Sequence, residues 1–169
     1  MSTERTRILN ERQIDQKITR MANQILENHY KSKKLFFVGI RKQGVPVAQR
    51  LIDELKLISD IEIELLEIEL IKDKPLSEEV ILSGDLKTLK NQVVIVVDDV
   101  LNSGRTLMYA VGYLLGAAPK SIGTAVLVER IHRRFPVRAD YVGLTLSTNM
   151  KEHVSVQMRA GRAVAYLEE

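Results

Sequence analysis

Cysteine is absent from the 169-residue sequence. This absence excludes disulfide bonds, thiolate metal sites and a cysteine nucleophile, and it suits a reducing compartment. Long hydrophobic runs are also absent, since none approaches the roughly 18 residues that a membrane-spanning helix needs. The first residues, MSTERTRILNERQ, carry too much charge for a signal peptide. We therefore expect a soluble, cytoplasmic protein.

Two glycine-rich nucleotide motifs are absent as well. None of the nine glycines is followed by lysine, which excludes the phosphate-binding loop G-x-x-x-x-G-K-[ST] of many ATPases. No two glycines lie two positions apart, which excludes the dinucleotide motif G-x-G-x-x-G. A nucleotide or phosphate ligand would therefore need a different loop.

The net charge of +3 is small, but basic residues gather in two places. Residues 1–34 contain eight Lys and Arg against four acids, and the segment RIHRRFPVR at 130–138 contains four arginines. Either group could form a surface for anions or nucleic acid, or an ordinary solvated face.

Strand and helix patterns alternate along the middle of the chain, which predicts one α/β domain over residues 1–169 with a mostly parallel sheet and right-handed crossovers. In residues 61–70 apolar and acidic residues partly alternate, so we expect a half-exposed strand whose glutamates face solvent. Helical spacing is found at residues 11–30, 45–58 and 105–117. Strand patterns are found at 35–40, 61–70, 93–97, 121–130, 139–146, 154–158 and 163–168.

The segment VVIVVDDVLNSGRT contains the strongest functional signal. Its five aliphatic residues predict a buried strand, and ligands of such sheets bind beyond the strand ends. Ser103, Gly104 and Thr106 would lie at a helix N-terminus, where free N–H groups favour a phosphate. Asp98 and Asp99 suit vicinal hydroxyls or a hydrated cation, so the loop suits a ribose 5-phosphate. The alternative is a helix cap, for which one aspartate would suffice.

This segment resembles the ribose-phosphate motif of the type I phosphoribosyltransferases. VGIRKQG resembles the pyrophosphate loop of that family, and residues 71–90 correspond to its mobile catalytic flap. The tract AVLVERIHRRFPVRADYVG is similar to the branch of pyrimidine-operon regulators and uracil phosphoribosyltransferases. The resemblance implies a mostly parallel sheet flanked by helices, with a small hood.

The resemblance also implies roles for individual residues. Asp98 and Asp99 would bind the ribose hydroxyls of phosphoribosyl pyrophosphate (PRPP) and, through these hydroxyls or water, a Mg²⁺ ion. Together with Arg41 they would be the catalytic residues. The 5-phosphate would be held by Asn102, Ser103, Gly104, Arg105 and Thr106. The pyrophosphate would be held by Arg41, Lys42, Gln43 and Gly44, in a loop that often contains a cis peptide bond; as an alternative, Arg41 and Lys42 are solvated loop charges.

The implied reaction is displacement of pyrophosphate at the anomeric carbon by a ring nitrogen of a nucleobase. Purine relatives have an aspartate in place of Asn102 and a lysine in place of Glu129, which favours uracil as the acceptor and UMP as the product. Backbone groups near Val142 and Leu144 would recognise the base. The sequence departs from the uracil branch at residues 71–74 and 143–149.

The same branch binds leader RNA of the pyrimidine operon, which makes an RNA-binding attenuation regulator the main alternative. Asn23 and Leu144 depart from the RNA-binding pattern of the family. A further alternative is a protein that binds PRPP or a nucleotide without turnover. The family implies a homodimer or a larger homo-oligomer. The residues that match RNA-contacting positions are Thr19, Arg20, His132, Arg133 and Arg138.

Overall fold

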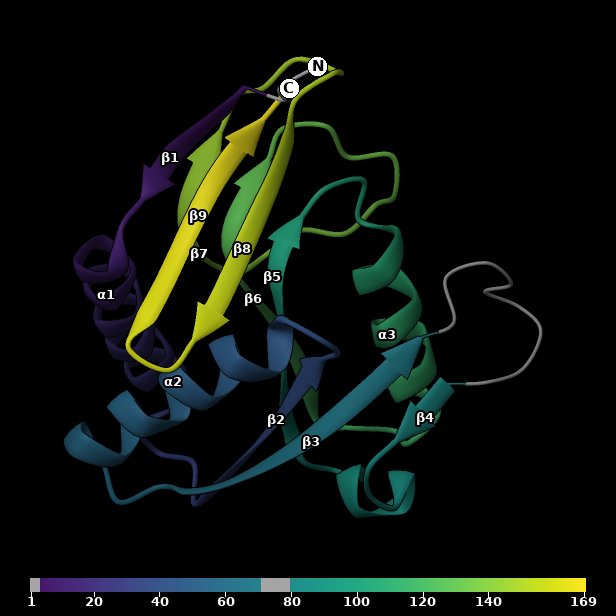
Figure 1. Ribbon diagram of the computed structural model, residues 1–169. Coiled ribbons are helices and arrows are strands. Elements are labelled where there is room, and N and C mark those ends of the chain that lie inside the picture. The colour runs from purple at the N-terminus through teal and green to yellow at the C-terminus, as the bar shows by residue number, and fades with distance from the viewer. Residues whose placement is uncertain (1–3, 71–79) are drawn as a thin grey trace.

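The computed structural model describes residues 4–70 and 80–169, and its main element is a six-stranded sheet with the order β4-β3-β2-β5-β6-β7 (Figure 1). All neighbours in this sheet are parallel except β3 and β4, which confirms the predicted mostly parallel α/β fold. Its strands are β2 (Lys34–Ile40), β3 (Glu62–Leu70), β4 (Val80–Leu82), β5 (Val93–Leu101), β6 (Ser121–Arg130) and β7 (Tyr141–Leu146).

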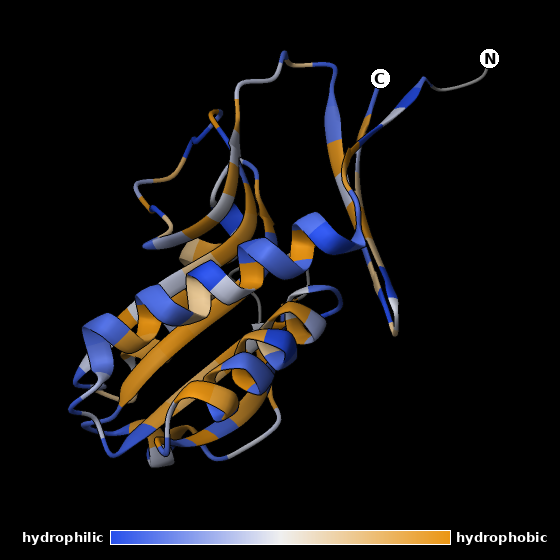
Figure 2. Ribbon diagram, turned by 90° about the vertical axis from the view of Figure 1, so that its left-hand side faces the viewer, coloured by the Kyte–Doolittle hydropathy of each residue, from blue (hydrophilic) through white to orange (hydrophobic). Residues whose placement is uncertain are grey.

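Helices cover both faces of this sheet because its central strands are apolar on both sides. In β5, Ile95 and Val97 belong to the core cluster beneath α1 (Glu11–His29) and α2 (Gly44–Ile58). Val94 and Val96 point to the opposite face, where they join the cluster beneath α3 (Arg105–Leu115). Figure 2 shows the largely hydrophobic strands and the hydrophilic outer side of α1. Within the described ranges, no helix is long and apolar enough to cross a membrane.

A second sheet, the hood, consists of three antiparallel strands in the order β1-β9-β8. These are β1 (Arg5–Leu9), β8 (His153–Arg159) and β9 (Arg162–Glu168). The pair β8 and β9 confirms the strands predicted at the end of the chain, whereas β1 was not predicted. Leu9, Val156, Ala163 and Ala165 bury their side chains in the same core cluster as α1 and α2, so hood and main sheet share one core.

The predicted flap, residues 71–90, lies only partly within the described residues. Residues 71–79 fall outside them. β4 pairs with β3, and a short 3₁₀-helix follows at Leu86–Leu89, with Leu89 fully buried. Val80–Leu82 therefore form the edge strand of the main sheet, and Leu89 packs into the core cluster beneath α3.

The connections of the central strands position a ligand site. From β2 the chain passes through α2 to β3, whereas from β5 it passes through α3 to β6 on the other side. The strand order thus reverses between the adjacent strands β2 and β5, and such a reversal opens a crevice at the carboxyl ends of the strands. The predicted ligand segments lie at these two ends, since residues 41–44 follow β2 and residues 98–106 comprise the last residues of β5 and the loop after it.

Candidate active site

The loop after β5 brings the predicted phosphate residues together. Gly104 adopts a left-handed conformation (φ 86°) and forms the N-cap of α3 without any side-chain cap. Among the described residues, the first N–H groups of α3 other than that of Arg105 therefore remain available to an anion at the helix N-terminus. A small, partly open pocket lies here, and its lining includes Asp98, Asn102, Ser103, Gly104, Arg105 and Thr106.

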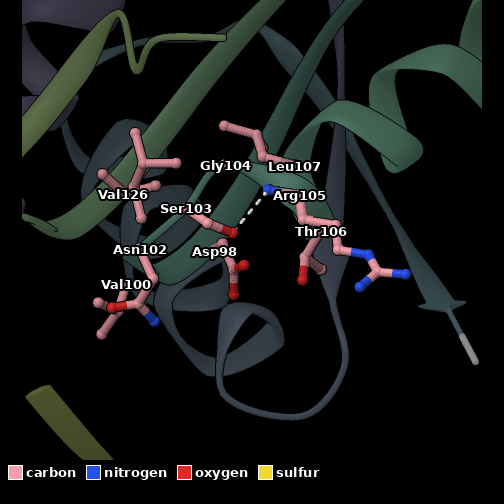
Figure 3. A pocket seen from close by; sticks show the side chains of 10 residues that line it. Asp98, Val100, Asn102, Ser103, Gly104, Arg105, Thr106, Leu107 and Val126 are labelled. Atoms are coloured by element: carbon pink, nitrogen blue, oxygen red, sulfur yellow. Dashed lines mark hydrogen bonds between the residues drawn. The ribbon is translucent and has the colours of Figure 1, made fainter. Parts of the chain in front are cut away.

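Figure 3 shows how the side chains lie around this pocket. Asp98 and Thr106 point to the same side of the loop, whereas the Arg105 guanidinium points away from Asp98. That guanidinium lies 5.9 Å from the centre of the Tyr109 ring. The N–H of Arg105 donates a hydrogen bond to Ser103 Oγ (3.3 Å), so Arg105 contributes its backbone to the loop more directly than its charge.

The two carboxylates after the aliphatic run differ in position. Both are half-buried within β5, which extends to Leu101 beyond the five aliphatic residues that predicted the strand. Asp98 lines the phosphate pocket, and its Oδ1 accepts a hydrogen bond from the Asp99 N–H (2.8 Å). Asp99 is not among the residues that line the pocket, because neighbouring strand residues point to opposite faces.

Segment 134–137 braces the phosphate loop from outside. The carbonyl oxygen of Ser103 accepts hydrogen bonds from the N–H groups of Arg134 (2.8 Å) and Phe135 (3.1 Å). A Cβ atom on Gly104 would lie 2.7 Å from a methyl carbon of Val137. Gly104 is therefore needed both for its positive φ and for this close contact.

The loop after β2 lies against the Asp98 backbone. The peptide bond between Arg41 and Lys42 is cis, as the resemblance implied. A Cβ atom on Gly44 would lie 2.6 Å from the Val97 carbonyl oxygen and 3.0 Å from Asp98 Cα. The two loops that the sequence assigned to phosphate and pyrophosphate are thus in direct contact.

The side chains of the loop after β2 are held in different ways. Arg41 forms ion pairs with Glu67 (3.3 Å) and Glu69 (2.9 Å) of β3, and Lys42 is exposed. The side-chain oxygen of Gln43 accepts a hydrogen bond from the Met158 N–H in the hood (3.0 Å). Arg41 therefore ties the loop after β2 to the carboxylates of β3, and Gln43 ties the same loop to the backbone of β8 in the hood.

The residues predicted to recognise the base lie on β7. Val142 and Leu144 are half-buried, and neither lines the phosphate pocket. Arg20 Nη2 donates to the carbonyl oxygens of Val142 (3.0 Å) and Gly143 (2.6 Å). The backbone of β7 is therefore already bonded to α1 at the predicted base position.

Four of the five predicted RNA-contacting side chains form hydrogen bonds within the protein. Besides Arg20, Thr19 bonds to Glu54 (3.3 Å), and His132 Nε2 is hydrogen-bonded to the Thr148 carbonyl. Arg133 donates to the Val137 carbonyl (3.3 Å). Arg138 differs, because its side chain is 81% exposed and forms a long ion pair with Asp140 (3.8 Å).

Sequence reasoning missed the role of Arg130, which it treated only as a member of the basic segment. Arg130 is 7% exposed and contacts Asn102, Thr148 and Asn149 through three nitrogen atoms. It also lines a second, open pocket beside the phosphate loop, together with Asn102, Ser103 and residues 131–134. The available signal was an arginine at the end of a buried aliphatic strand, where a charge needs partners.

Comparisons with known proteins agree with this geometry. The family model of the phosphoribosyl transferase domain matches residues 4–160. The chain is 36% identical over 166 residues to the bifunctional protein PyrR of Pelotomaculum thermopropionicum, covering 94% of this chain and 92% of that protein. It is 37% identical over 147 residues to the PyrR protein of Enterococcus faecalis, covering 83% of each.

Solved structures agree on the fold. The hypoxanthine phosphoribosyltransferase of Trypanosoma cruzi superposes with a TM-score of 0.78 at 18% identity, covering 97% of both chains. A hypoxanthine-guanine phosphoribosyltransferase from Bacillus anthracis gives a TM-score of 0.72 at 21% identity, covering 87% of this chain and 85% of that one. With the match to the domain model and the identity to PyrR proteins, the chain belongs to the phosphoribosyltransferase family, in its bifunctional PyrR branch.

Proposed function

We propose that this phosphoribosyltransferase transfers ribose 5-phosphate from PRPP to uracil, giving UMP and pyrophosphate. The main supporting observation is that one pocket contains both the Asp98 carboxylate and the N-terminus of α3. The N–H groups at residues 103–106 would hold the 5-phosphate, and Asp98 would accept hydrogen bonds from the ribose hydroxyls. Gly44 lies against Asp98, so the pyrophosphate loop would adjoin the same ribose.

The residues of the site fit a Mg²⁺ ion that is held mainly by the substrate. Among residues 4–70 and 80–169, no group of three or more His, Cys, Asp or Glu could hold a metal ion. Mg²⁺ usually keeps several waters and binds through one or two carboxylates together with substrate phosphates. Asp98 and Asp99 would hold it through ribose hydroxyls or water. When bound, the ion would stabilise charge on the leaving pyrophosphate.

The protein itself would contribute binding and orientation. Asp98 and the α3 N-terminus would fix the ribose ring, while the exposed Lys42 and the guanidinium of Arg41 would attract the pyrophosphate. Correct positioning of two reactants contributes strongly to catalysis without any covalent nucleophile. The proposed mechanism therefore needs no side chain that attacks the sugar.

Two side chains near the site favour uracil over a purine. Asn102 carries an amide, which cannot take up a proton at neutral pH. Glu129 carries a carboxylate, whose oxygen accepts a hydrogen bond from Thr145 (3.4 Å), and it cannot donate to the oxygen of a 6-oxopurine. These residues give no support to purine recognition.

The direct test measures pyrophosphate release from PRPP and Mg²⁺ with uracil, cytosine, hypoxanthine, guanine, xanthine and adenine. We expect release with uracil alone, and a loss of about 100-fold or more in kcat/KM for Asp98→Asn, as for other electrostatic groups of active sites. Asp53→Asn is the matched control, because Asp53 is exposed on α2 and asparagine can also accept its hydrogen bond from Gln49. Full activity of Asp98→Asn, or release with a purine, would contradict this assignment.

PRPP binding without any release of pyrophosphate would favour the alternative of a regulator that binds the donor without turnover.

We also propose that the protein binds pyrimidine leader RNA, since its relatives are called bifunctional and Arg138 presents an exposed guanidinium. Labelled leader RNA should shift at micromolar protein, and both added salt and Arg138→Gln should weaken the shift. An unshifted RNA at this concentration would count against the second function. A cytoplasmic location remains a prediction from the sequence composition, and a homo-oligomeric state remains a prediction from the family resemblance.

A further inference from the structure

Arg130 is the most deeply buried charged residue that lies beside the phosphate loop. Its Nε donates to Thr148 Oγ1 (2.9 Å), Nη1 donates to Asn102 Oδ1 (3.1 Å), and Nη2 donates to the Asn149 carbonyl (3.2 Å). No carboxylate forms an ion pair with it in the described part of the chain. Three neutral oxygens accept hydrogen bonds from this buried guanidinium, and no ion pair within the described residues offsets the free-energy cost of its desolvation.

The bond to Arg130 determines which way the Asn102 amide faces. A guanidinium has only donors, so the amide must turn its oxygen toward Arg130. The amide nitrogen then points away from Arg130. Because Asn102 also lines the phosphate pocket, the Nδ2 donors are available to an acceptor there. An unrestrained amide could present either atom.

We infer that Arg130 is a positioning residue of the phosphoribosyl site, which fixes the Asn102 amide so that Nδ2 donates to an oxygen of the 5-phosphate. This inference rests on the proposed function, because it takes the ligand of the pocket to be a phosphate ester. Arg130 does not touch the ligand in this assignment. It acts through Asn102 and joins the phosphate loop to residues 148–149.

Arg130 also helps to hold the turn at residues 146–152, which precedes β8. His132 also bonds to Thr148, so two side chains of the segment after β6 hold this turn. The Asn149 side chain in turn accepts from the N–H groups of Lys151 (2.9 Å) and Glu152 (3.1 Å). Arg130 therefore connects the phosphate loop with a turn that leads directly into the hood strand β8.

The test compares Arg130→Met, Arg130→Lys and the control Arg134→Met. Arg134 lines the same open pocket, and its contact with the phosphate loop is made by its backbone. Arg130→Met should raise the Kd and KM for PRPP by roughly 10-fold to 100-fold, the range for a lost hydrogen bond to a charged group, with a smaller change in kcat. Arg130→Lys should recover part of this loss, and Arg134→Met should leave the Kd for PRPP unchanged.

A double-mutant cycle separates positioning from general destabilisation. In the Asn102→Ala background, Arg130→Met should change the Kd for PRPP by less than about twofold, because the two side chains act as one unit. Equal effects of Arg130→Met in both backgrounds would overturn the inference. If Arg130→Met does not fold, Arg130→Lys serves in the same cycle.

A ligand-free measurement keeps this inference apart from the proposed function. The side-chain amide signals of Asn102, assigned by their loss in Asn102→Ala, should move toward random-coil positions in Arg130→Met and stay unchanged in Arg134→Met. Unchanged signals in Arg130→Met would refute the fixed amide, whether or not PRPP binds. If Arg130→Met shows these shifts but the wild-type protein binds no PRPP, only the proposed function would be contradicted.

Discussion

Gly44 is the residue at which the two ligand loops come closest. Its Cα lies so near β5 that a Cβ atom would approach both the Val97 carbonyl oxygen and the Asp98 backbone. Real Cβ atoms do not come within 3.0 Å of backbone atoms, so any side chain here must push the loops apart. The spacing between the proposed ribose and pyrophosphate groups therefore depends on the absence of one methyl group.

We predict that Gly44→Ala weakens PRPP binding by about 10-fold or more, because displacement of a loop by about 1 Å can cost 100-fold in rate. Titration calorimetry with PRPP and Mg²⁺ measures this effect. Gly112→Ala is the control, since nothing lies within 4 Å of its Cβ position in α3. That change should leave PRPP binding intact and stabilise the fold by about 0.5–1 kcal/mol. Equal PRPP affinity of Gly44→Ala and wild type would refute the close loop contact.

At the scale of elements, β3 supplies carboxylates to the loop of its neighbour β2. In the parallel register Gly39 lies opposite Glu67 and Ile40 opposite Ile68, so Arg41 follows directly beside Glu69. The alternating pattern predicted solvent-facing glutamates, and Glu62 and Glu64 are exposed as expected. Glu67 and Glu69 instead pair with the arginine that the sequence assigned to pyrophosphate.

We predict that Glu69→Gln tightens PRPP binding, because pyrophosphate and Glu69 compete for Arg41. The Glu69 side chain is 45% exposed, so the ion pair contributes at most about 1 kcal/mol and the gain in affinity should stay below about fivefold. Glu64 lies on β3 as Glu69 does, and Glu64→Gln, which breaks a pair with Lys34 of β2, should leave the Kd unchanged. Weaker binding of PRPP by Glu69→Gln would mean that Glu69 orients Arg41 for the ligand.

The sequence predicted elements well where the signal is local. The helical stripe of Ile14, Ile18, Met21 and Ile25 is buried as expected, and the aliphatic run before Asp98 forms the central strand. It did not predict β1, because the strand that pairs with it lies at the other end of the chain. The contiguous phosphate loop could be predicted as a motif. The bonds of Arg130 could not, since they join residues 18 to 28 positions apart.

At the scale of the whole molecule, a partly buried polar network joins the end of α1 to β7. Asn28 donates to the Tyr141 hydroxyl (2.8 Å), which lies 3.4 Å from His29 Nε2. Burial lowers the pKa of His29 below its ordinary value of 6.5, and burial also raises the pKa of Tyr141. The folded state therefore favours a neutral imidazole at His29.

This gives the free energy of unfolding a defined pH dependence. Above pH 6.5 both states are neutral at His29, and its contribution is complete. As the pH falls through 6.5 the unfolded chain takes up the proton first, so stability decreases until the pH passes the folded pKa. Urea unfolding between pH 8 and pH 5 should show a smaller decrease for His29→Gln than for wild type. Parallel curves for the two proteins would contradict the lowered pKa.

The hydrogen bond between Gln43 and Met158 also bears on how the site forms during folding. It joins residues 115 positions apart, and the contact between Glu11 and Ala163 joins residues 152 apart. Contacts of such high sequence separation close large loops, which slows folding. During synthesis, the loop at residues 41–44 therefore acquires its attachment to the hood only after β8 has left the ribosome. The site proposed for PRPP is completed among the last parts of the molecule.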